Sequence, residues 1–388
     1  MSKLDELIRK LCPDGVEFVE LKDISLKVMS GGTPSSGNID YYGGDIPWLR
    51  TQEVIFGDII DTGVKITQLG LDNSSAKWIP ANCVIIAMYG ATVGRVGINK
   101  ISLTTNQACC NIEINPDKAL YKYVFHYVKS KYEYIKSLGK GSQTNVNAQI
   151  IKSIEIPLPP LPVQEEIVRI LDNFTELTAE LTAELTARKK QYEYYSDSLL
   201  ESGDEVECKP LGEICEIKTG SKPKTINNSN GYYEYINAGT TNSGYVDTYN
   251  CDGDTVTTPS RGQGGIGFVG YQKNKFFLGP LCYKIKAQDK TKLLTKYIYY
   301  YLQSNNEMLF KIKNEGGVPS VNRADLVKLT ISLPPLAEQQ RIVDILDRFD
   351  VLCNDITSGL PAEIKAREQQ YEYYRDKLLT FKKLEEQQ

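Results

Sequence analysis

Three short stretches of the sequence contain residue types that could carry out chemistry. GQGGIG at residues 262–267 has the glycine spacing of a dinucleotide-binding turn. That function requires a helix directly afterwards, to receive the pyrophosphate, but residues 268–271 (FVGY) have the pattern of a strand. EIK at 216–218 could be half of a metal-dependent nuclease site, although no Pro-Asp pair precedes it at a useful position. GKGS at 139–142 resembles the end of a phosphate-binding loop that lacks its first glycine.

The chain offers few other residues for catalysis. It has one histidine, His126, which we expect to be a structural residue of a helix, and no G-x-S-x-G or Asn-Pro-Pro-Tyr element. The nine cysteines are scattered without a C-x-x-C pair, so we expect reduced thiols in a cytoplasmic protein rather than a zinc site. The sequence therefore predicts no catalytic site and no bound metal or cofactor.

Polar loops of a kind suited to nucleic acid follow several predicted strands. Arginine pairs with guanine edges, asparagine and glutamine pair with adenine, and lysine and serine contact phosphates. Each residue alone is better explained as ordinary polar surface, but the recurrence of such residues at matching places in both halves of the chain favours DNA binding for the set. The candidates are Arg50, Thr51, Gln52, Tyr89, Thr92, Arg95, Lys140, Ser142, Gln143 and Asn145 in the first half, and Asn237, Thr241, Asn242, Ser260, Arg261, Gln263, Lys311, Lys313, Asn314, Ser320, Asn322 and Arg323 in the second.

These loops belong to a chain that repeats itself. Residues 139–174 align with 314–349 without a gap, and 15 of the 36 positions are identical. QYEYY recurs at 191–195 and 370–374, and VEFVELKDI at 16–24 has a counterpart in VECKPLGEI at 206–214. A repeat of this length predicts one architecture used twice. We expect an N-terminal helix at 1–15, a globular domain at 16–158, a helix at 159–203, a second globular domain at 204–333 and a second helix at 334–388.

The two repeated helices are predicted to pair. Both begin after a Pro-Pro sequence, which cannot lie inside a helix, and both then place apolar residues at spacings of three and four. Helices of about forty residues, far longer than usual, favour an antiparallel coiled coil over two isolated core helices. In the second helix, the step from Leu360 to Ile364 is a four-residue stutter. It coincides with Gly359 and Pro361, which predict a kink or a short break there.

The globular domains are expected to be β-rich, which gives an α+β fold with a pseudo-twofold repeat. A short helix is expected at 4–11, and tyrosine-rich helices at 121–137 and 294–310 should end each domain. The candidate strands are 46–50, 83–88 and 92–98 in the first domain, and 235–237, 255–258 and 267–271 in the second.

Charge is distributed unevenly along the chain. The net charge of −4 argues against a general polyanion binder. Residues 161–205 contain 11 acidic and 4 basic side chains, whereas residues 271–328 contain 11 basic and 4 acidic ones. This asymmetry fits a nucleic-acid-binding face and a solvated charged surface equally well. The sequence has no apolar stretch long enough for a membrane span, and its first residues (MSKLDE) lack the features of a signal peptide.

Several motifs together resemble a known family. They are LPPL at 158–161 and its copy at 333–336, TAEL at 178–181 and 182–185, GLP at 359–361, both QYEYY segments and LCPDGVE at 11–17. Each is weak alone, but together, in the order globular, helix, globular, helix, they span the chain. The sequence resembles the specificity subunits of type I restriction–modification enzymes.

The resemblance implies a non-catalytic, DNA-recognising chain. Each globular domain would be a target-recognition domain for one half of a split double-stranded DNA sequence. The helices would pair, hold the domains apart and dock two methylation subunits, with restriction or translocase subunits as further partners. S-adenosylmethionine, ATP and Mg would then bind the partner subunits, and no membrane is involved. Two alternatives stay open: a specificity chain of a differently organised, type IIB-like assembly, and a coiled-coil adaptor that binds protein or glycan.

Overall fold

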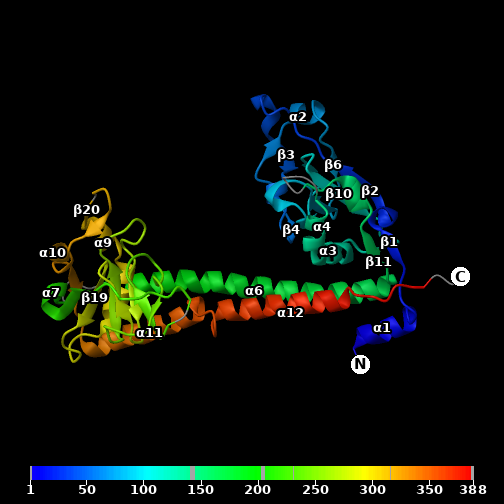
Figure 1. Cartoon of the computed structure of the whole chain (residues 1–388). Helices are drawn as coiled ribbons and strands as arrows, with labels where there is room; N and C mark the ends of the chain where they lie inside the picture. Colours follow the sequence, from blue (N-terminus) through cyan, green and yellow to red (C-terminus); the bar gives the residue numbers. More distant parts are fainter. Residues whose placement is uncertain (1, 140–144, 202–205, 230, 315, 386–388) are drawn as a thin grey trace. The chain divides into compact units, whose positions relative to one another are not determined.

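The computed structural model describes residues 2–139, 145–201, 206–229, 231–314 and 316–385. The chain divides into two compact units, one formed by Met1–Glu180 with Ile364–Gln388 and the other by Leu181–Glu363 (Figure 1). Each unit combines one β-rich domain with segments of the long helices. The first unit is therefore discontinuous in sequence, because its last segment comes from the C-terminal end of the chain.

The first unit begins with helix α1 (Lys3–Leu11), which confirms the predicted N-terminal helix. Its largest sheet has the strand order β2-β10-β7-β8-β4, a second sheet has the order β5-β3-β9-β6, and β1 pairs with β11. The strands are β1 (Phe18–Glu20), β2 (Ser25–Ser30), β3 (Tyr42–Leu49), β4 (Asp58–Ile59), β5 (Lys65–Ile66), β6 (Trp78–Ile79), β7 (Val84–Ala87), β8 (Val96–Asn99), β9 (Leu103–Thr105), β10 (Cys109–Ile114) and β11 (Glu155–Pro157). The short helices are η1 (Leu21–Ile24), η2 (Ile39–Tyr41), η3 (Thr51–Glu53), η4 (Gly90–Thr92), α2 (Gln68–Asp72) and α5 (Ala148–Lys152).

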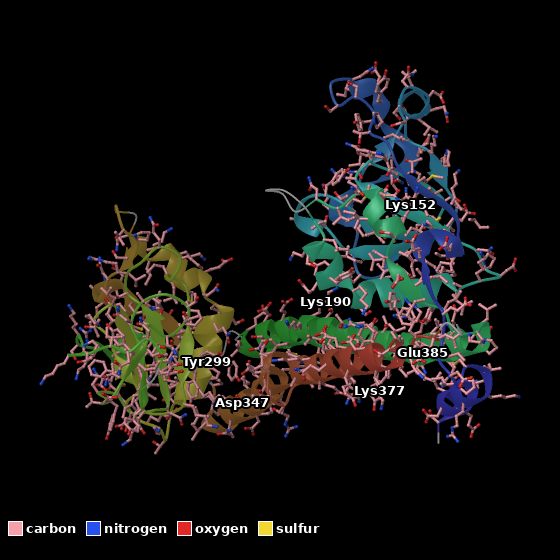
Figure 2. The ribbon with its side chains drawn as sticks, turned by 45° about the vertical axis from the view of Figure 1, so that its right-hand side comes forward. Lys152, Lys190, Tyr299, Asp347, Lys377 and Glu385 are labelled. Carbon is pink, nitrogen blue, oxygen red and sulfur yellow. The ribbon has the colours of Figure 1, made fainter. Side chains whose placement is uncertain are left out.

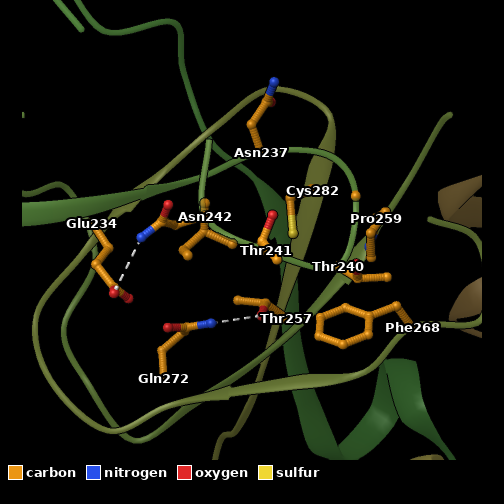
Figure 3. A pocket seen from close by; sticks show the side chains of 12 residues that line it. Glu234, Asn237, Thr240, Thr241, Asn242, Thr257, Pro259, Phe268, Gln272 and Cys282 are labelled. Atoms are coloured by element: carbon orange, nitrogen blue, oxygen red, sulfur yellow. Dashed lines mark hydrogen bonds between the residues drawn. The ribbon is translucent and has the colours of Figure 1, made fainter. Parts of the chain in front are cut away.

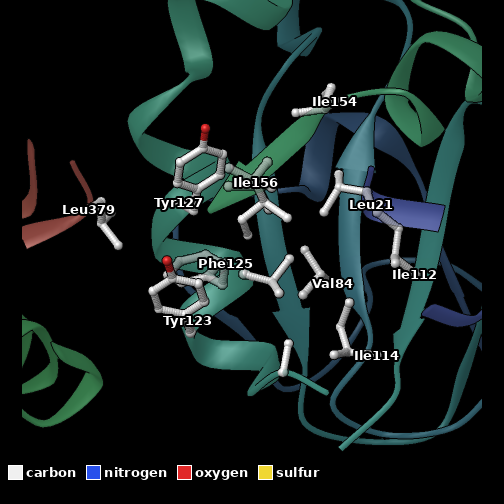
Figure 4. Packing of buried hydrophobic residues seen from close by; sticks show 14 of the residues in the cluster. Leu21, Val84, Ile112, Ile114, Tyr123, Phe125, Tyr127, Ile154, Ile156 and Leu379 are labelled. Atoms are coloured by element: carbon white, nitrogen blue, oxygen red, sulfur yellow. The ribbon is translucent and has the colours of Figure 1, made fainter. Parts of the chain in front are cut away.

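Strand β7 explains why the first domain has a core on both faces of its main sheet. All four of its residues are buried, and they alternate between two apolar clusters: Val84 and Ile86 face one, Ile85 and Ala87 the other. A strand covered on both faces has the continuous apolar run seen here. Helix α3 (Tyr121–Ser130) closes one cluster, and the hydroxyl of its buried Tyr123 donates to Pro157 O at 2.9 Å (Figure 4).

The second unit repeats this plan. Its sheet order β13-β19-β16-β17 reproduces β2-β10-β7-β8, and β15-β14-β18 reproduces β5-β3-β9, including one parallel pair in each. β12 pairs with β22 as β1 does with β11. The strands are β12 (Cys208–Pro210), β13 (Cys215–Thr219), β14 (Tyr233–Ile236), β15 (Tyr245–Val246), β16 (Thr255–Pro259), β17 (Gly270–Gln272), β18 (Phe277–Leu278), β19 (Cys282–Ala287), β20 (Lys313–Asn314), β21 (Ser320–Val321) and β22 (Thr330–Ser332), with short helices α7 (Leu211–Ile214) and α10 (Arg323–Leu326).

Some predicted elements have different bounds in the structure. The helix expected at 121–137 is interrupted at Lys131 and forms α3 and α4 (Tyr132–Ser137). Its counterpart at 294–310 forms α8 (Thr295–Ser304) and α9 (Glu307–Lys311). The strand expected at 267–271 starts only at Gly270, because the preceding residues form turns in which Gly264 and Gly267 have φ of 82° and 89°. The glycine-rich stretch thus leads into a strand rather than a helix.

The long helices pair antiparallel, as predicted. Helix α6 (Leu161–Leu200) is continuous, whereas the second copy is α11 (Leu336–Asn354) and α12 (Leu360–Leu378), with the predicted short break between them. In the first unit Phe174 stacks on Tyr374 with ring centroids 5.4 Å apart. In the second unit Phe349 stacks on Tyr195 at 5.6 Å. The early part of each copy thus contacts the late part of the other. No helix in the described ranges is long and apolar enough to cross a membrane.

A buried glutamine fixes each domain to the start of its long helix. The Gln164 side chain is fully buried; its Oε1 accepts from Leu120 N at 2.9 Å, and its Nε2 donates to Pro159 O and Lys118 O at 2.8 and 3.3 Å. Gln339 makes the same three bonds in the second unit, to Leu294 N, Pro334 O and Lys292 O. One amide side chain thereby satisfies three backbone groups from two segments.

Replacing this side chain should destabilise the first unit strongly. Gln164→Ala leaves buried backbone groups without partners, so we expect the free energy of unfolding to fall by about 2–4 kcal/mol. Urea unfolding followed by tryptophan fluorescence reports on this unit, since both tryptophans, Trp48 and Trp78, belong to it. The control is Gln149→Ala, at an exposed position of the same domain, which should change stability by less than about 0.5 kcal/mol. Equal effects of the two substitutions on the free energy of unfolding would contradict the structural role of the Gln164 side chain.

Candidate nucleic-acid interface

Backbone hydrogen bonds gather several predicted loops at one end of the first domain. Asn106 N donates to Leu49 O at 2.9 Å, Met88 N to Ala108 O at 2.8 Å, and Val146 N to Met88 O at 2.9 Å. These bonds tie the ends of β3 and β7 to the turn between β9 and β10 and to the segment at 145–146. The candidates that directly adjoin the bonded residues are Arg50, Tyr89 and Asn145.

The loop after β3 also contacts the loop after β7. Helix η3, which contains Thr51 and Gln52, packs against η4, which ends at Thr92. Arg50 Nε donates to Glu53 Oε2 at 3.1 Å, and Glu53 Oε1 accepts from Gly63 N at 2.5 Å. The arginine is thus held in one orientation while a third of its side chain remains exposed. Predicted residues from two separate loops form one surface.

This end of the domain contains buried polar atoms that the protein itself does not satisfy. Arg95 Nε, Asn106 Oδ1 and Asn145 Oδ1 are inaccessible and have no hydrogen-bond partner among the described residues. An unsatisfied buried polar group costs about 1–3 kcal/mol, so it is rarely retained without a reason. These three atoms lie beneath the exposed polar loops of this end of the domain. Lys140, Ser142 and Gln143 lie outside the described residues.

The second domain has the same backbone framework with different side chains. Gly279 N donates to Ile236 O at 2.7 Å, Ser260 N to Leu281 O at 2.8 Å, and Val321 N to Ser260 O at 2.9 Å. The backbone of Arg261 forms an isolated antiparallel β-bridge with the backbone of Ser320, and β20 pairs with β21 directly beside it. The predicted residues that this arrangement brings together are Ser260, Arg261, Lys313, Asn314 and Ser320.

A small polar pocket of about 150 Å³ lies beside this framework (Figure 3). The candidate residues Thr241 and Asn242 line it, and Asn242 Nδ2 donates to Glu234 Oε1 at 3.3 Å. Gln272 and Thr257 also line the pocket, joined by a hydrogen bond of 3.2 Å. These two residues could not be singled out from the sequence, because they lie within strands, where polar residues are also common on ordinary solvent-facing surfaces.

Other candidates in the second domain have structural contacts. Asn237 Oδ1 accepts from Leu281 N at 3.0 Å and so fixes the β18–β19 turn. Arg323 Nε donates to Ile217 O in β13 at 2.9 Å, which directs this arginine toward its own domain. Lys311 ends α9, and Asn322 directly precedes α10. Gln263 lies in the turn that leads to β17.

The EIK segment at 216–218, considered above as half of a metal-dependent nuclease site, forms an ion-pair cluster in the structure. The Glu216 carboxylate lies 2.8 Å from Lys284 Nζ and 2.9 Å from Lys218 Nζ. Hydrogen bonds from these lysines lower the pKa of Glu216, so its charge is balanced by the protein itself. Within the described ranges, no group of three or more His, Cys, Asp or Glu side chains could hold a metal ion.

Each domain also has an aspartate contact with its long helix. Asp172 of α6 accepts from Lys122 Nζ at 2.5 Å and lies 3.0 Å from His126 Nε2. Asp347 of α11 accepts from Lys296 Nζ at 2.8 Å and from Tyr300 OH at 2.5 Å. Figure 2 shows α8, labelled at Tyr299, beside α11, labelled at Asp347.

His126 is a structural helix residue, as predicted, and it also contacts Tyr371 of α12. Its Nδ1 lies 3.1 Å from Tyr371 OH. Burial lowers the pKa of His126 below its usual 6.5, and the hydrogen bond to Asp172 offsets only part of this effect. The folded protein thus favours the neutral imidazole, which is compatible with a contact role and not with a charged DNA contact.

This histidine should make the stability of the first unit depend on pH. Below pH 6.5 the unfolded chain takes up a proton that folded His126 resists, so the free energy of unfolding should fall by at most about 1.4 kcal/mol per pH unit between pH 7 and 5. His126→Gln should remove this part of the slope, as measured by urea unfolding with tryptophan fluorescence. Tyr300→Phe, at the equivalent position of the second unit, is the control and should leave the slope unchanged. If the free energy of unfolding of His126→Gln depends on pH as steeply as that of the unsubstituted protein, His126 is not the source of the pH dependence.

Comparisons with known proteins agree with this duplicated architecture. The model of the type I restriction modification DNA specificity domain matches residues 13–188 and again 203–366. A putative type I restriction enzyme specificity subunit of Haemophilus influenzae is 31% identical over 392 residues, covering 94% of both chains. The specificity subunit of EcoR124I/EcoR124II from Escherichia coli is 38% identical over 299 residues, which are 69% of this chain and 73% of that protein.

Solved structures show the same fold. The type I restriction–modification S subunit from M. genitalium superposes with a TM-score of 0.63 at 18% identity, over 94% of this chain and 96% of the other. A chain from a study of type I system assembly and conformational transition gives a TM-score of 0.59 at 19% identity, over 95% and 98%. The two matched domains define a specificity chain rather than a single recognition module. The protein belongs to the type I restriction–modification DNA specificity family.

Proposed function

We propose that each domain of this chain recognises one half of a split double-stranded DNA target. The recognition domains are residues 16–158 and 204–333, preceded by an N-terminal helix at 1–15. The observation that carries the proposal is the identical backbone framework at both loop ends, which presents different side chains. Equivalent positions carry Arg50 and Asn237, Tyr89 and Arg261, and Asn145 and Ser320.

The side chains at these positions suit DNA groups of different kinds. Arg50 and Arg261 have guanidinium groups with the geometry for guanine edges, and Asn242 has an amide for adenine. Lys313 and Ser320 have donors for phosphate oxygens, which position a protein on the duplex without selecting a sequence. Two surfaces with the same scaffold and different donors and acceptors fit a target whose halves differ in sequence.

The helices at 159–203 and 334–388 are proposed to dock two methylation subunits. Each carries an exposed aromatic pair from the repeated QYEYY motif: Tyr194–Tyr195, with ring centroids 5.6 Å apart, and Tyr373–Tyr374, at 5.3 Å. Tyr194 and Tyr373 are 69% and 62% exposed, although large aromatic side chains usually have most of their area buried. A surface that occurs twice fits two copies of one partner. Under this proposal the chain selects the DNA site and performs no chemistry, and restriction or translocase subunits join through the same assembly.

Mapping methylated bases tests the DNA-recognition role. The chain is co-expressed with the methylation subunit encoded beside it, and methylated bases are located across the host genome. We expect a split motif, with two short half-sites around a fixed gap. Exchanging residues 16–158 for the corresponding segment of a related chain should change one half-site only, because the other domain is untouched. The exchanged complex is checked by co-purification.

A negative result is equally informative. If a stable complex forms and no split motif appears, the DNA-recognition role is wrong, and an adaptor function for the helix pair becomes the better explanation. If the exchange changes both half-sites, the two domains do not act independently.

The repeated TAEL segment in α6 predicts how the gap is set. Inserting a further Thr-Ala-Glu-Leu after Leu185 adds about 6 Å and slightly more than one helical turn, so the apolar seam is kept. We expect a longer gap with both half-sites unchanged, measured by the same methylation mapping. Thr182→Ala, which keeps the helix length, is the control and should leave the gap as it was. Altered half-sites around a constant gap would contradict this role of the helix.

A further inference from the structure

We propose that the β9–β10 turn of the first domain, and Gln107 in particular, recognises an adenine edge in the half-site of that domain. The inference rests on the proposed DNA-recognition function and adds a residue and a base to it. Gln107 was not among the residues predicted from the sequence. It ends the polar run TTNQ at 104–107, in the short turn between β9 and β10, a stretch for which no strand was expected.

The turn is anchored on both sides of Gln107. The preceding residue, Asn106, donates its backbone N–H to Leu49 O at 2.9 Å, and the carbonyl of the following residue, Ala108, accepts from Met88 N at 2.8 Å. These bonds place Gln107 between the ends of β3 and β7, close to the loops that contain Arg50 and Tyr89. Gln107 is exposed, so its amide can contact another molecule.

A neighbouring threonine orients the amide of Gln107. Thr33 Oγ1 donates to Gln107 Oε1, whereas Gln107 Nε2 has no hydrogen-bond partner among the described residues. Thr33 is brought there because Gly32 N donates to Thr105 O at 2.9 Å, and Gly31 lies so close to Thr105 that a Cβ would collide with it. The oxygen keeps a second lone pair, so the side chain offers one donor and one acceptor to another molecule.

Adenine presents the complementary pair in the major groove. Its N7 accepts a hydrogen bond and its N6 amino group donates one, so a glutamine amide can bind both at once. An amide that is oriented before binding loses less entropy on contact and discriminates better. Asn106 lies directly beside it in the same turn.

The second domain has no such amide side chain at the equivalent turn, between β18 and β19. Gly279 and Pro280 occupy the positions of Asn106 and Gln107, since Gly279 N bonds to Ile236 O as Asn106 N bonds to Leu49 O. Neither residue has a side chain with a donor or acceptor, and Asn237 fills the space that a Cβ on Gly279 would need. The two turns therefore distinguish the recognition surfaces of the two domains, and they provide a matched control.

The test is methylation mapping with the full chain in complex with its methylation subunits. Gln107→Ala should reduce discrimination at one A·T position of the half-site that changes when residues 16–158 are exchanged, by about tenfold. Thr33→Val should give a smaller loss at the same position, because the amide is then no longer oriented. Gln107→Glu, which replaces the donor by an acceptor, should shift the preference at that position toward cytosine. Pro280→Ala should leave both half-sites unchanged.

The outcomes separate this inference from the proposed function. An unsubstituted chain that yields no split motif overturns the proposed function itself. A split motif that is unchanged in Gln107→Ala, with the complex intact by co-purification, overturns the role of Gln107. Loss of discrimination at a G·C position, or in the half-site of the other domain, overturns the adenine assignment. Equal effects of Pro280→Ala and Gln107→Ala would mean that the turns are structural only.

Discussion

The structure depends on a constraint imposed by burial: backbone groups removed from water need partners. Where each domain meets the start of its long helix, the chain leaves a regular element and cannot satisfy these groups through secondary structure. Gln164 and Gln339 supply the missing donors and acceptor from one side chain each. The surrounding aspartate contacts, from Asp172 and Asp347, add charge-assisted bonds to the same junction. These polar contacts act together with apolar residues of the same helices, such as Leu171 and Leu346, which are buried in the domain cores.

Duplication with divergence has affected the backbone and the side chains differently. The three hydrogen bonds that shape each loop end join backbone atoms only, so the residues at these positions can change without loss of the framework. His126 and Tyr300 show the same freedom at the helix junction, where an imidazole and a phenol both contact an aspartate. Such a scaffold permits new DNA sequences to be recognised while the attachment to the helices is retained.

The repeat, the helix pair and the break before Leu360 could be predicted from the sequence, because they depend on prolines, glycines and apolar spacing that act locally. The sheet order could not, since β2 pairs with β10 and β13 with β19 across long stretches of chain. The candidate site was predicted in part. Polar runs such as that at 50–52 identified some loops, but nothing in the sequence indicates that Asn237, which lines the same pocket as Asn242, also holds a turn through its amide oxygen. Gln107 was missed because only tertiary hydrogen bonds bring its turn beside Arg50.

The discontinuous first unit has a consequence for how the protein is made. Tyr371 and Leu379 belong to the apolar core of this unit, and Val16 pairs with the backbone at Lys382 and Leu384. These residues are synthesised after the whole of the second unit, so the domain that is synthesised first cannot complete its packing until they have emerged. The second unit is continuous in sequence and has all its residues earlier. During synthesis the first domain is therefore the more exposed to misfolding and proteolysis, and a chain that terminates early would lose it.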